Sequence, residues 1–232
     1  MNGQACGKPL RPWLEPPLTG SLSGQWRLPL PEELSFSSGA AISCGTGASY
    51  RALVRLNLSA RQTIAIFGQG PVGQLAHAMN ARVIAVDLNA ERPQRAREFG
   101  ADTLIDPAKT DALEALRDLT RGVGVDCVLE TSGASSARIA AVRGHQDLGR
   151  LLFRRRSRRR HDNVSPDMIR RQMTIIASWT FSTVGQADCA KFIAERGINV
   201  DGIYTGRWSR DQAAEAYRLF DQGICGKGVF LM

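Results

Sequence analysis

The chain has 232 residues, 43% of them hydrophobic, and a formal net charge of +8. That length can form one sizeable core, or one and a half domains, and no apolar run is long enough to cross a bilayer. Residues 1–24 lack the charged and apolar segments of a signal peptide. The five cysteines form no C-x-x-C pair, which argues against a disulfide framework or a four-cysteine zinc site. We therefore expect a cytoplasmic protein with no membrane partner.

The positive charge is concentrated in one tract. Six arginines lie in Arg154–Arg160, and without them the net charge would be +2. Such a tract can bind phosphate backbones in a salt-dependent way, but no aromatic residue is interleaved and no known nucleic-acid module surrounds it. We therefore expect a solvated loop. A nucleic-acid-binding protein that uses Arg154–Arg160 is an alternative that we do not favour.

In chain order, the first two segments differ in pattern. Residues 1–34 are rich in proline and glycine and show no sustained period, which predicts an irregular, poorly ordered N-terminus. Residues 35–60 form a helical lead-in, with the helical pattern running from Ser35 to Leu56.

A strand, a glycine-rich turn, a helix and a second strand follow in close succession. Thr63–Phe67 reads as a buried strand, Gly68–Gly73 has the spacing G-x-G-x-x-G, and Arg82–Val86 is a second strand that leads into Asp87. The spacing alone is a weak signal. Between a strand and a helix, with an acid after the second strand, it is typical of a dinucleotide-binding unit.

Each residue of this unit has an expected role. Gly68 permits the tight turn, and Gly70 lets a pyrophosphate approach the backbone. Gly73 lets the helix lie close to the sheet, and its first turn, with Val72, would face the phosphates. Asp87 would accept hydrogen bonds from the adenosine ribose, which favours NAD over NADP because a 2′-phosphate would meet a carboxylate.

Further strands and helices alternate up to residue 143. They are a unit from Arg82 to Gly100 with Asn89 as N-cap, a strand Thr103–Asp106, a helix opening at Asp111, a strand Val125–Glu130 and a helix Ser135–Arg143. This alternation predicts an α/β fold with a Rossmann-type, doubly wound parallel sheet over residues 61–182. Ligand should bind at the carboxyl ends of the strands, near Gly68–Gly73, Asp87, Asp106 and Thr131–Gly133.

The block from residue 144 to residue 162 departs from this pattern. A parallel sheet needs an apolar fifth strand here, but only Leu151–Phe153 supplies apolar residues before the arginine tract. Regular patterning then returns with a strand at Met173–Trp179.

A C-terminal helix-strand extension is expected over residues 183–232. Its elements are a helix Gln186–Arg196, a strand Ile203–Thr205, a helix from Asp211 and a terminal strand Gly228–Met232. Ser209 and Gln212 have capping-box spacing. The apolar face of the last helix is predicted to bury Ala213, Ala214, Tyr217 and Phe220.

Three stretches together resemble the zinc-containing (medium-chain) alcohol dehydrogenase family. They are Ala41–Gly47 with Tyr50, Gly68–Gly73 with Asp87, and Asp211–Tyr217 leading to Gly226–Val229. The resemblance implies an NAD-dependent oxidoreductase that passes hydride between a small-molecule alcohol or carbonyl substrate and NAD. It also implies a possible homodimer, paired through the edge of the Rossmann sheet.

The metal site implied by the resemblance is incomplete in this sequence. Cys44 matches the last of the protein zinc ligands by position, whereas most of the family's N-terminal catalytic domain, which carries the other ligands, has no counterpart. No histidine precedes His77, and Cys6 is the only cysteine before Cys44. A catalytic zinc needs three protein ligands. Zinc is therefore expected by resemblance only, and a buried thiol is the alternative for Cys44.

Several alternatives stay open at this point. The chain could bind NAD without catalysing a reaction, and no catalytic residue can be assigned from the sequence. Arg92 could flank the adenosine or be a solvated helix residue. A methyltransferase could share the glycine turn but not the other two stretches. A short-chain dehydrogenase is excluded, because no tyrosine is followed four residues later by a lysine.

Overall fold

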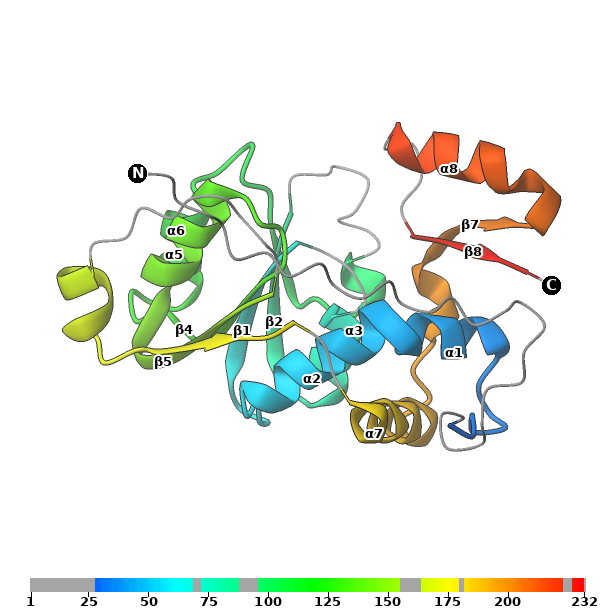
Figure 1. Ribbon diagram of the computed structural model, residues 1–232. Helices are drawn as coiled ribbons and strands as arrows, with labels where there is room; N and C mark the ends of the chain where they lie inside the picture. Colours follow the sequence, from blue (N-terminus) through cyan, green and yellow to red (C-terminus); the bar gives the residue numbers. More distant parts are fainter. Residues whose placement is uncertain are drawn as a thin grey trace, which may run out of the picture.

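The computed structural model describes residues 28–68, 72–87, 96–154, 164–179, 182–222 and 227–231. Six parallel strands form the main sheet in the order β3-β2-β1-β4-β5-β6, and β7 and β8 form a second, two-stranded parallel sheet (Figure 1). The strands are β1 (Thr63–Phe67), β2 (Arg82–Val86), β3 (Thr103–Ile105), β4 (Val125–Glu130), β5 (His145–Phe153), β6 (Thr174–Ala177), β7 (Tyr204–Trp208) and β8 (Lys227–Phe230). This order confirms the predicted Rossmann-type, doubly wound sheet.

Helices cover both faces of the main sheet. The helices of the described residues are α1 (Phe36–Ala41), the π-helical turn η2 (Ile42–Thr46), α2 (Gly47–Arg55), α3 (Val72–Ala78), α5 (Ala112–Leu119), α6 (Ser135–Gly144), η3 (Val164–Ile169), α7 (Thr183–Glu195), η4 (Val200–Ile203), η5 (Arg210–Gln212) and α8 (Ala213–Asp221). Figure 1 shows α5 and α6 on one face, with α2, α3 and α7 on the other. Within the described ranges, no helix has the length and apolar content that a membrane span requires.

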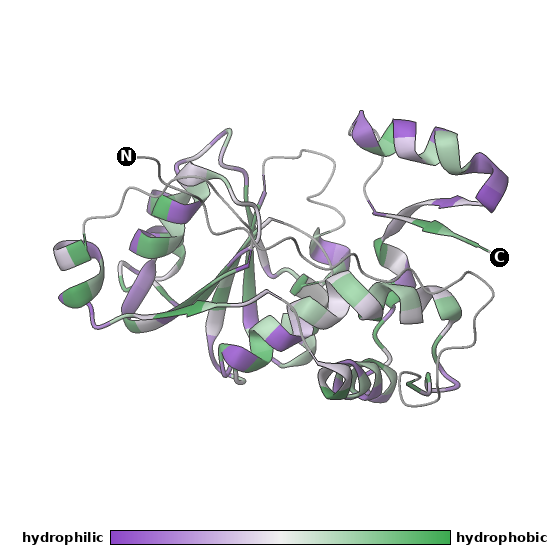
Figure 2. Ribbon diagram, viewed as in Figure 1, coloured by the Kyte–Doolittle hydropathy of each residue, from purple (hydrophilic) through white to green (hydrophobic). Residues whose placement is uncertain are grey.

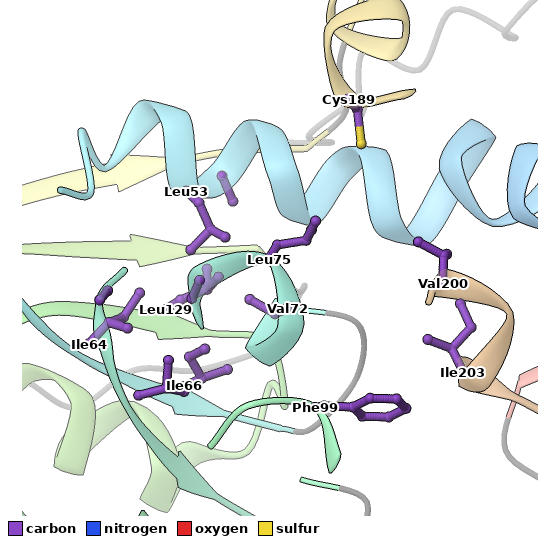
Figure 3. Packing of buried hydrophobic residues seen from close by; sticks show 14 of the residues in the cluster. Leu53, Ile64, Ile66, Val72, Leu75, Phe99, Leu129, Cys189, Val200 and Ile203 are labelled. Carbon is purple, nitrogen blue, oxygen red and sulfur yellow. The ribbon is translucent and has the colours of Figure 1, made fainter. Parts of the chain in front are cut away.

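Two hydrophobic cores result from the alternation of side chains along the strands. Ile64 and Ile66 of β1 point to the core under α2 and α3, where they lie near Leu53 and Leu75 (Figure 3). Phe67, with the opposite parity, joins the core under α5 and α6. Because β1, β2 and β4 are buried on both faces, most of their residues are apolar, and green, hydrophobic segments lie in the main sheet in Figure 2. The exceptions are Thr63, Arg82, Asp126 and Glu130.

The fifth strand is a correction to the sequence analysis. The block from residue 144 departs from the expected sequence pattern of a fifth strand, yet β5 extends over nine residues and pairs with both β4 and β6. Leu151 and Leu152 are fully buried and lie beside Val128 and Leu129. Two apolar residues in register with an apolar neighbour are therefore enough to specify this strand, although a bulge interrupts its pairing with β4.

The apolar face of α8 is a second correction. Ser209 and Gln212 form the predicted capping box, but Ala216 is the buried residue of the helix. The side chains of Tyr217 and Phe220 are 69% and 60% exposed, so the prediction of a buried face was wrong for them. The reason is that, among the described elements, α8 packs mainly on the small β7-β8 sheet, where Tyr217 contacts Phe230 with ring centroids 6.1 Å apart.

Segments outside the described residues leave some predictions without a structural counterpart. The irregular N-terminus up to residue 27, the proposed N-cap Asn89 and the arginines Arg155–Arg160 all lie there. The glycine-turn helix is described from Val72, and its crossover joins β1 to β2 as adjacent parallel strands paired residue by residue.

The first residue of β5 is a fully buried histidine. His145 is 0% exposed, and burial lowers the pKa of its imidazole to about 4, with a further contribution from the Arg171 cation. The side chain is therefore neutral in the folded protein at neutral pH.

This histidine predicts acid sensitivity of the fold. In the unfolded chain the imidazole protonates near its ordinary pKa of 6.5, so between pH 6.5 and about 4 the unfolded state binds more protons. The contribution of His145 to the free energy of unfolding is complete above pH 6.5. It is lost as the pH falls toward 4, and the loss is at most about 3 kcal/mol. Urea unfolding at pH 7, 6, 5 and 4.5 should show the decline, and His145→Leu should flatten it. An equal slope in the variant would contradict the assignment.

Candidate functional site

The ends of β1 and β4 meet in a close contact between two turns. The amide of Thr131 donates to the carbonyl of Phe67 at 2.9 Å, and the Thr131 hydroxyl donates to the same carbonyl at 2.8 Å. Gly68 has φ +89°, and a Cβ added there would lie 2.8 Å from Thr131 Oγ1. Both the backbone conformation and the close approach therefore require glycine at position 68.

A cavity of about 400 Å³ opens beside this contact, a volume in the range of small-molecule pockets. The chain leaves β1 toward α3 on one face and leaves β4 toward α6 on the other, so the cavity lies where the strand order reverses. Its lining comes from the ends of β1, β2 and β4 and from the starts of α5 and α6, and includes Gly68, Asp87, Asp111, Thr131, Ser132 and Ser136.

The structure brings two of the predicted cofactor residues together. Gly68 is linked to the end of β2 by a hydrogen bond from its amide to the Val86 carbonyl at 2.9 Å, and Asp87 follows directly. Both residues line the cavity. Asp106 does not line it. Its carboxylate instead accepts from the amide of Ala108 at 3.0 Å.

The other predicted cofactor residues are placed differently or not described. Val72 begins α3, and its side chain is buried in the core, so any contact with a ligand would come from its backbone. Gly73 lies in the same helix. Gly70 and Arg92 lie outside the described residues. The roles of all six cofactor-binding residues stay predictions.

A buried ion pair under the cavity was not found from the sequence. Glu130, the last residue of β4, is 0% exposed and accepts hydrogen bonds from Ser132 Oγ at 2.6 Å and from the Gly133 amide at 2.7 Å. The Nε of Arg138 on α6 donates to it at 3.3 Å. The pair fixes the turn from Thr131 to Gly133. The sequence gives only a weak signal for this ion pair. That signal is an acidic residue at the end of a mostly apolar strand, followed by small polar residues.

The predicted zinc ligand is not part of a metal site in the described residues. Cys44 lies exposed on η2, so the alternative of a thiol buried against the sheet was wrong. In the part of the chain that the structure describes, no three His, Cys, Asp or Glu side chains are grouped to hold a metal ion. A catalytic zinc needs three protein ligands, so these residues do not fit the zinc implied by the resemblance.

Arg154, the first arginine of the basic tract, packs against the folded protein and is hydrogen-bonded to it. The amide of Arg154 donates to the Glu130 carbonyl at 3.1 Å, and its Nη1 donates to Ser49 Oγ on α2 at 3.3 Å. Burial lowers the pKa of its guanidinium. The expectation of a solvated loop was therefore wrong for Arg154, because this residue directly follows β5 and lies against Ser49 on α2.

Removal of the Glu130 carboxylate is expected to destabilise the protein strongly. Glu130→Ala would leave Arg138 buried without its acid and free the turn at Thr131, which should cost about 3–5 kcal/mol of unfolding free energy. Glu114→Ala on the exposed surface of α5 is the control, and its effect should be below about 1 kcal/mol. Urea denaturation measures both. Equal, small effects would show that the pair does not hold the turn.

Comparison with known proteins agrees with this architecture. A family model described as zinc-binding dehydrogenase matches residues 71–196. YphC of Escherichia coli K12, an uncharacterized zinc-type alcohol dehydrogenase-like protein, is 33% identical over 206 residues, which are 86% of this chain and 58% of that protein. D-arabitol-phosphate dehydrogenase of Enterococcus avium is 29% identical over 217 residues, covering 88% of this chain and 59% of the relative.

Solved structures show the same fold. Alcohol dehydrogenase TADH from Thermus sp. ATN1 superposes with a TM-score of 0.80 at 20% identity, covering 87% of this chain and 60% of that one. The 2R,3R-butanediol dehydrogenase from Bacillus subtilis gives 0.74 at 26% identity, with 83% and 56% covered. The chain thus spans less than two thirds of the length of these relatives. On the family match and the shared fold, this chain belongs to the zinc-binding dehydrogenase family of oxidoreductases.

Proposed function

We propose that the chain binds NAD at the cavity between the ends of β1, β2 and β4 and serves hydride transfer between NAD and a small-molecule alcohol or carbonyl compound. The observation that supports the proposal is that Gly68, Asp87, Thr131 and Ser132 all line this one cavity. Bound NAD would supply the hydride acceptor, and the residues of this chain would bind and orient it.

The cavity suits the adenosine half of a dinucleotide. Gly68 gives the tight turn out of β1 and lets Thr131 approach it closely, which shapes this end of the cavity. Asp87, at the end of β2, offers carboxylate oxygens to ribose hydroxyls and would repel a 2′-phosphate, so we propose NAD over NADP. The ion pair of Glu130 and Arg138 holds the opposite wall before the ligand arrives, which lowers the cost of ordering it on binding.

The substrate part of the proposal rests on the relatives. Their names describe an alcohol dehydrogenase and a D-arabitol-phosphate dehydrogenase, which supports an alcohol substrate. The described residues do not form a zinc site, so we assign them no metal-dependent step. A nucleic-acid-binding role is not favoured, because Arg154 lies against Ser49 rather than in a free basic surface.

The cofactor proposal predicts a specific effect at Asp87. Asp87→Asn should weaken NAD binding about tenfold or more, since hydrogen bonds to a charged group contribute about 1.5–3 kcal/mol. The same change should narrow the preference for NAD over NADP. Isothermal titration of both cofactors measures these effects.

Asp118→Asn provides a matched control, because it removes one exposed carboxylate from α5 and should leave both affinities unchanged. Unaltered NAD affinity in Asp87→Asn would overturn the role of Asp87. A folded chain that binds neither cofactor would overturn the proposed function itself.

A further inference from the structure

A second cavity lies at the amino ends of β4 and β5, away from the proposed NAD site. Its volume is about 680 Å³, which is within the range of small-molecule pockets. Its lining comes from the loop Gly122–Gly124 before β4, from residues 145–147 at the start of β5, and from three arginines on separate segments. Because β4 and β5 are parallel, their amino ends lie about 20 Å from their carboxyl ends, so the two cavities are separate sites.

His145 is the buried polar residue of this lining. It is 0% exposed, and in the part of the chain that the structure describes neither of its ring nitrogens has a hydrogen-bond partner. A neutral imidazole has one donor and one acceptor, and each costs free energy when it is buried unpaired. A hydrogen-bonding ligand in the cavity would remove this cost.

Close packing puts Arg117 of α5 at the same corner of the molecule as His145. A Cβ added to Gly144 would lie 2.8 Å from Leu116 Cδ1, so the residues directly before His145 and Arg117 lie against each other. A Cβ on Gly124 would lie 2.6 Å from the carbonyl carbon of His145, which places the loop after α5 against β5. The end of α5 and the start of β5 therefore meet here, and both side chains line the cavity.

Arg171, just before β6, fixes the backbone around His145. Its Nη1 donates to the carbonyls of Val142 at 3.1 Å and Arg143 at 3.3 Å. Its Nη2 donates to the His145 carbonyl, and its Nε forms an ion pair with Asp147 at 3.0 Å. The end of α6 and the start of β5 are thus tied to one guanidinium, so this wall of the cavity is held in place before a ligand binds.

One of the three arginines at the cavity has no acidic partner. Arg143 Nη2 lies 3.3 Å from Asp167 Oδ2, and Arg171 is paired with Asp147. The ion pairs within the described ranges do not include Arg117, whose side chain is exposed. The arginines of the lining therefore carry one positive charge that no paired acid neutralises.

A ligand with negatively charged oxygens suits these groups. The Arg117 guanidinium can bind two oxygens of a carboxylate or phosphate through parallel N–H groups, and a ring N–H of His145 can donate to another. The nearby Asp126 carboxylate does not line the cavity, and its oxygens already accept from Gln146 Nε2 at 2.9 Å and from the Thr63 amide at 2.8 Å. A cation, by contrast, would be repelled by the arginines.

We propose that this cavity is a second ligand site, which binds a small carboxylate or phosphate compound through Arg117 and His145. Arg117 supplies a positive charge with paired donors, and His145 supplies a buried donor. The site goes beyond the proposed function, because it lies at the other end of the strands from Asp87 and does not depend on NAD.

NMR titration of the full chain tests the site through the imidazole signals of its three histidines. The probes are inorganic phosphate, acetate and uncharged glycerol at constant ionic strength, each with and without NAD. We expect phosphate, acetate or both to shift the signal of His145 and to leave those of His77 and His161 in place. Glycerol should shift none of them. The anion that binds more tightly identifies the chemical class of the ligand.

Matched variants identify the residues responsible. Arg117→Gln should weaken anion binding about tenfold or more, and Arg117→Lys, which keeps the charge but not the paired donors, should lie between it and the wild type. Arg51→Gln, which removes an exposed arginine from α2, is the control and should bind as the wild type does. His145→Gln assigns the histidine signal by its loss; if that variant does not fold, through-bond assignment of the wild-type spectrum replaces it.

The outcomes separate this inference from the proposed function. An unshifted His145 signal with both anions, an equal response to glycerol, or unchanged anion affinity in Arg117→Gln would overturn the site and leave NAD binding at Asp87 unaffected. Displacement of the anion by NAD would assign it to the cofactor cavity and also overturn the site. Anion binding that depends on Arg117 in a chain that binds no NAD would support the site while the proposed function fails.

Discussion

Thr131 connects the two halves of the sheet at the point where the chain changes faces. Its amide and hydroxyl both donate to the Phe67 carbonyl, so the turn after β4 is fixed to the turn after β1. Gly68 must adopt a positive φ beneath it, and Glu130 anchors the same turn from the other side. Because α3 and α6 lie on opposite faces of the sheet, this link lies where the chain changes faces, and both Gly68 and Thr131 line the cavity.

The Glu130 carboxylate is 0% exposed, and hydrogen bonds within the protein take the place of those to water. Ser132, the Gly133 amide and Arg138 all donate to it, and the Arg138 guanidinium lies 5.2 Å from the centroid of the Phe153 ring on β5. The arrangement therefore extends across β4 to β5. A buried pair of this kind is weak evidence for net stability, but loss of either partner leaves a buried charge. Its effect here is to hold one wall of the cavity in a single conformation.

The sequence predicted the elements whose signal is local. β1, β2 and β4 are rich in apolar residues, and Gly68 follows the first of them, so both the strands and the position of the cavity could be predicted. β5 could not, since the first half of the strand carries His145, Gln146 and Asp147 and only its register beside β4 buries Leu151 and Leu152. The exposure of Tyr217 likewise depends on which elements pack against α8. The apolar period of the helix sequence does not predict those elements.

The site was predictable to the same extent. The role of Asp87 could be predicted from its position directly after a strand. The contacts of Glu130 with Arg138 and of Arg154 with Ser49 form only in the folded chain and have no local signal. A basic tract is expected to be solvated because arginine is rarely buried, yet its first member, Arg154, follows β5 directly and contacts α2. No local feature of the sequence reports that contact.

Amide hydrogen–deuterium exchange with and without NAD tests the central claim most directly. If the dinucleotide binds across the ends of β1, β2 and β4, protection should increase at residues 67–68, 86–87 and 131–133. The amino ends of the same strands, near Thr63, Arg82 and Val125, should exchange as before. No added protection at those three carboxyl ends, or protection confined to another part of the chain, would contradict the account.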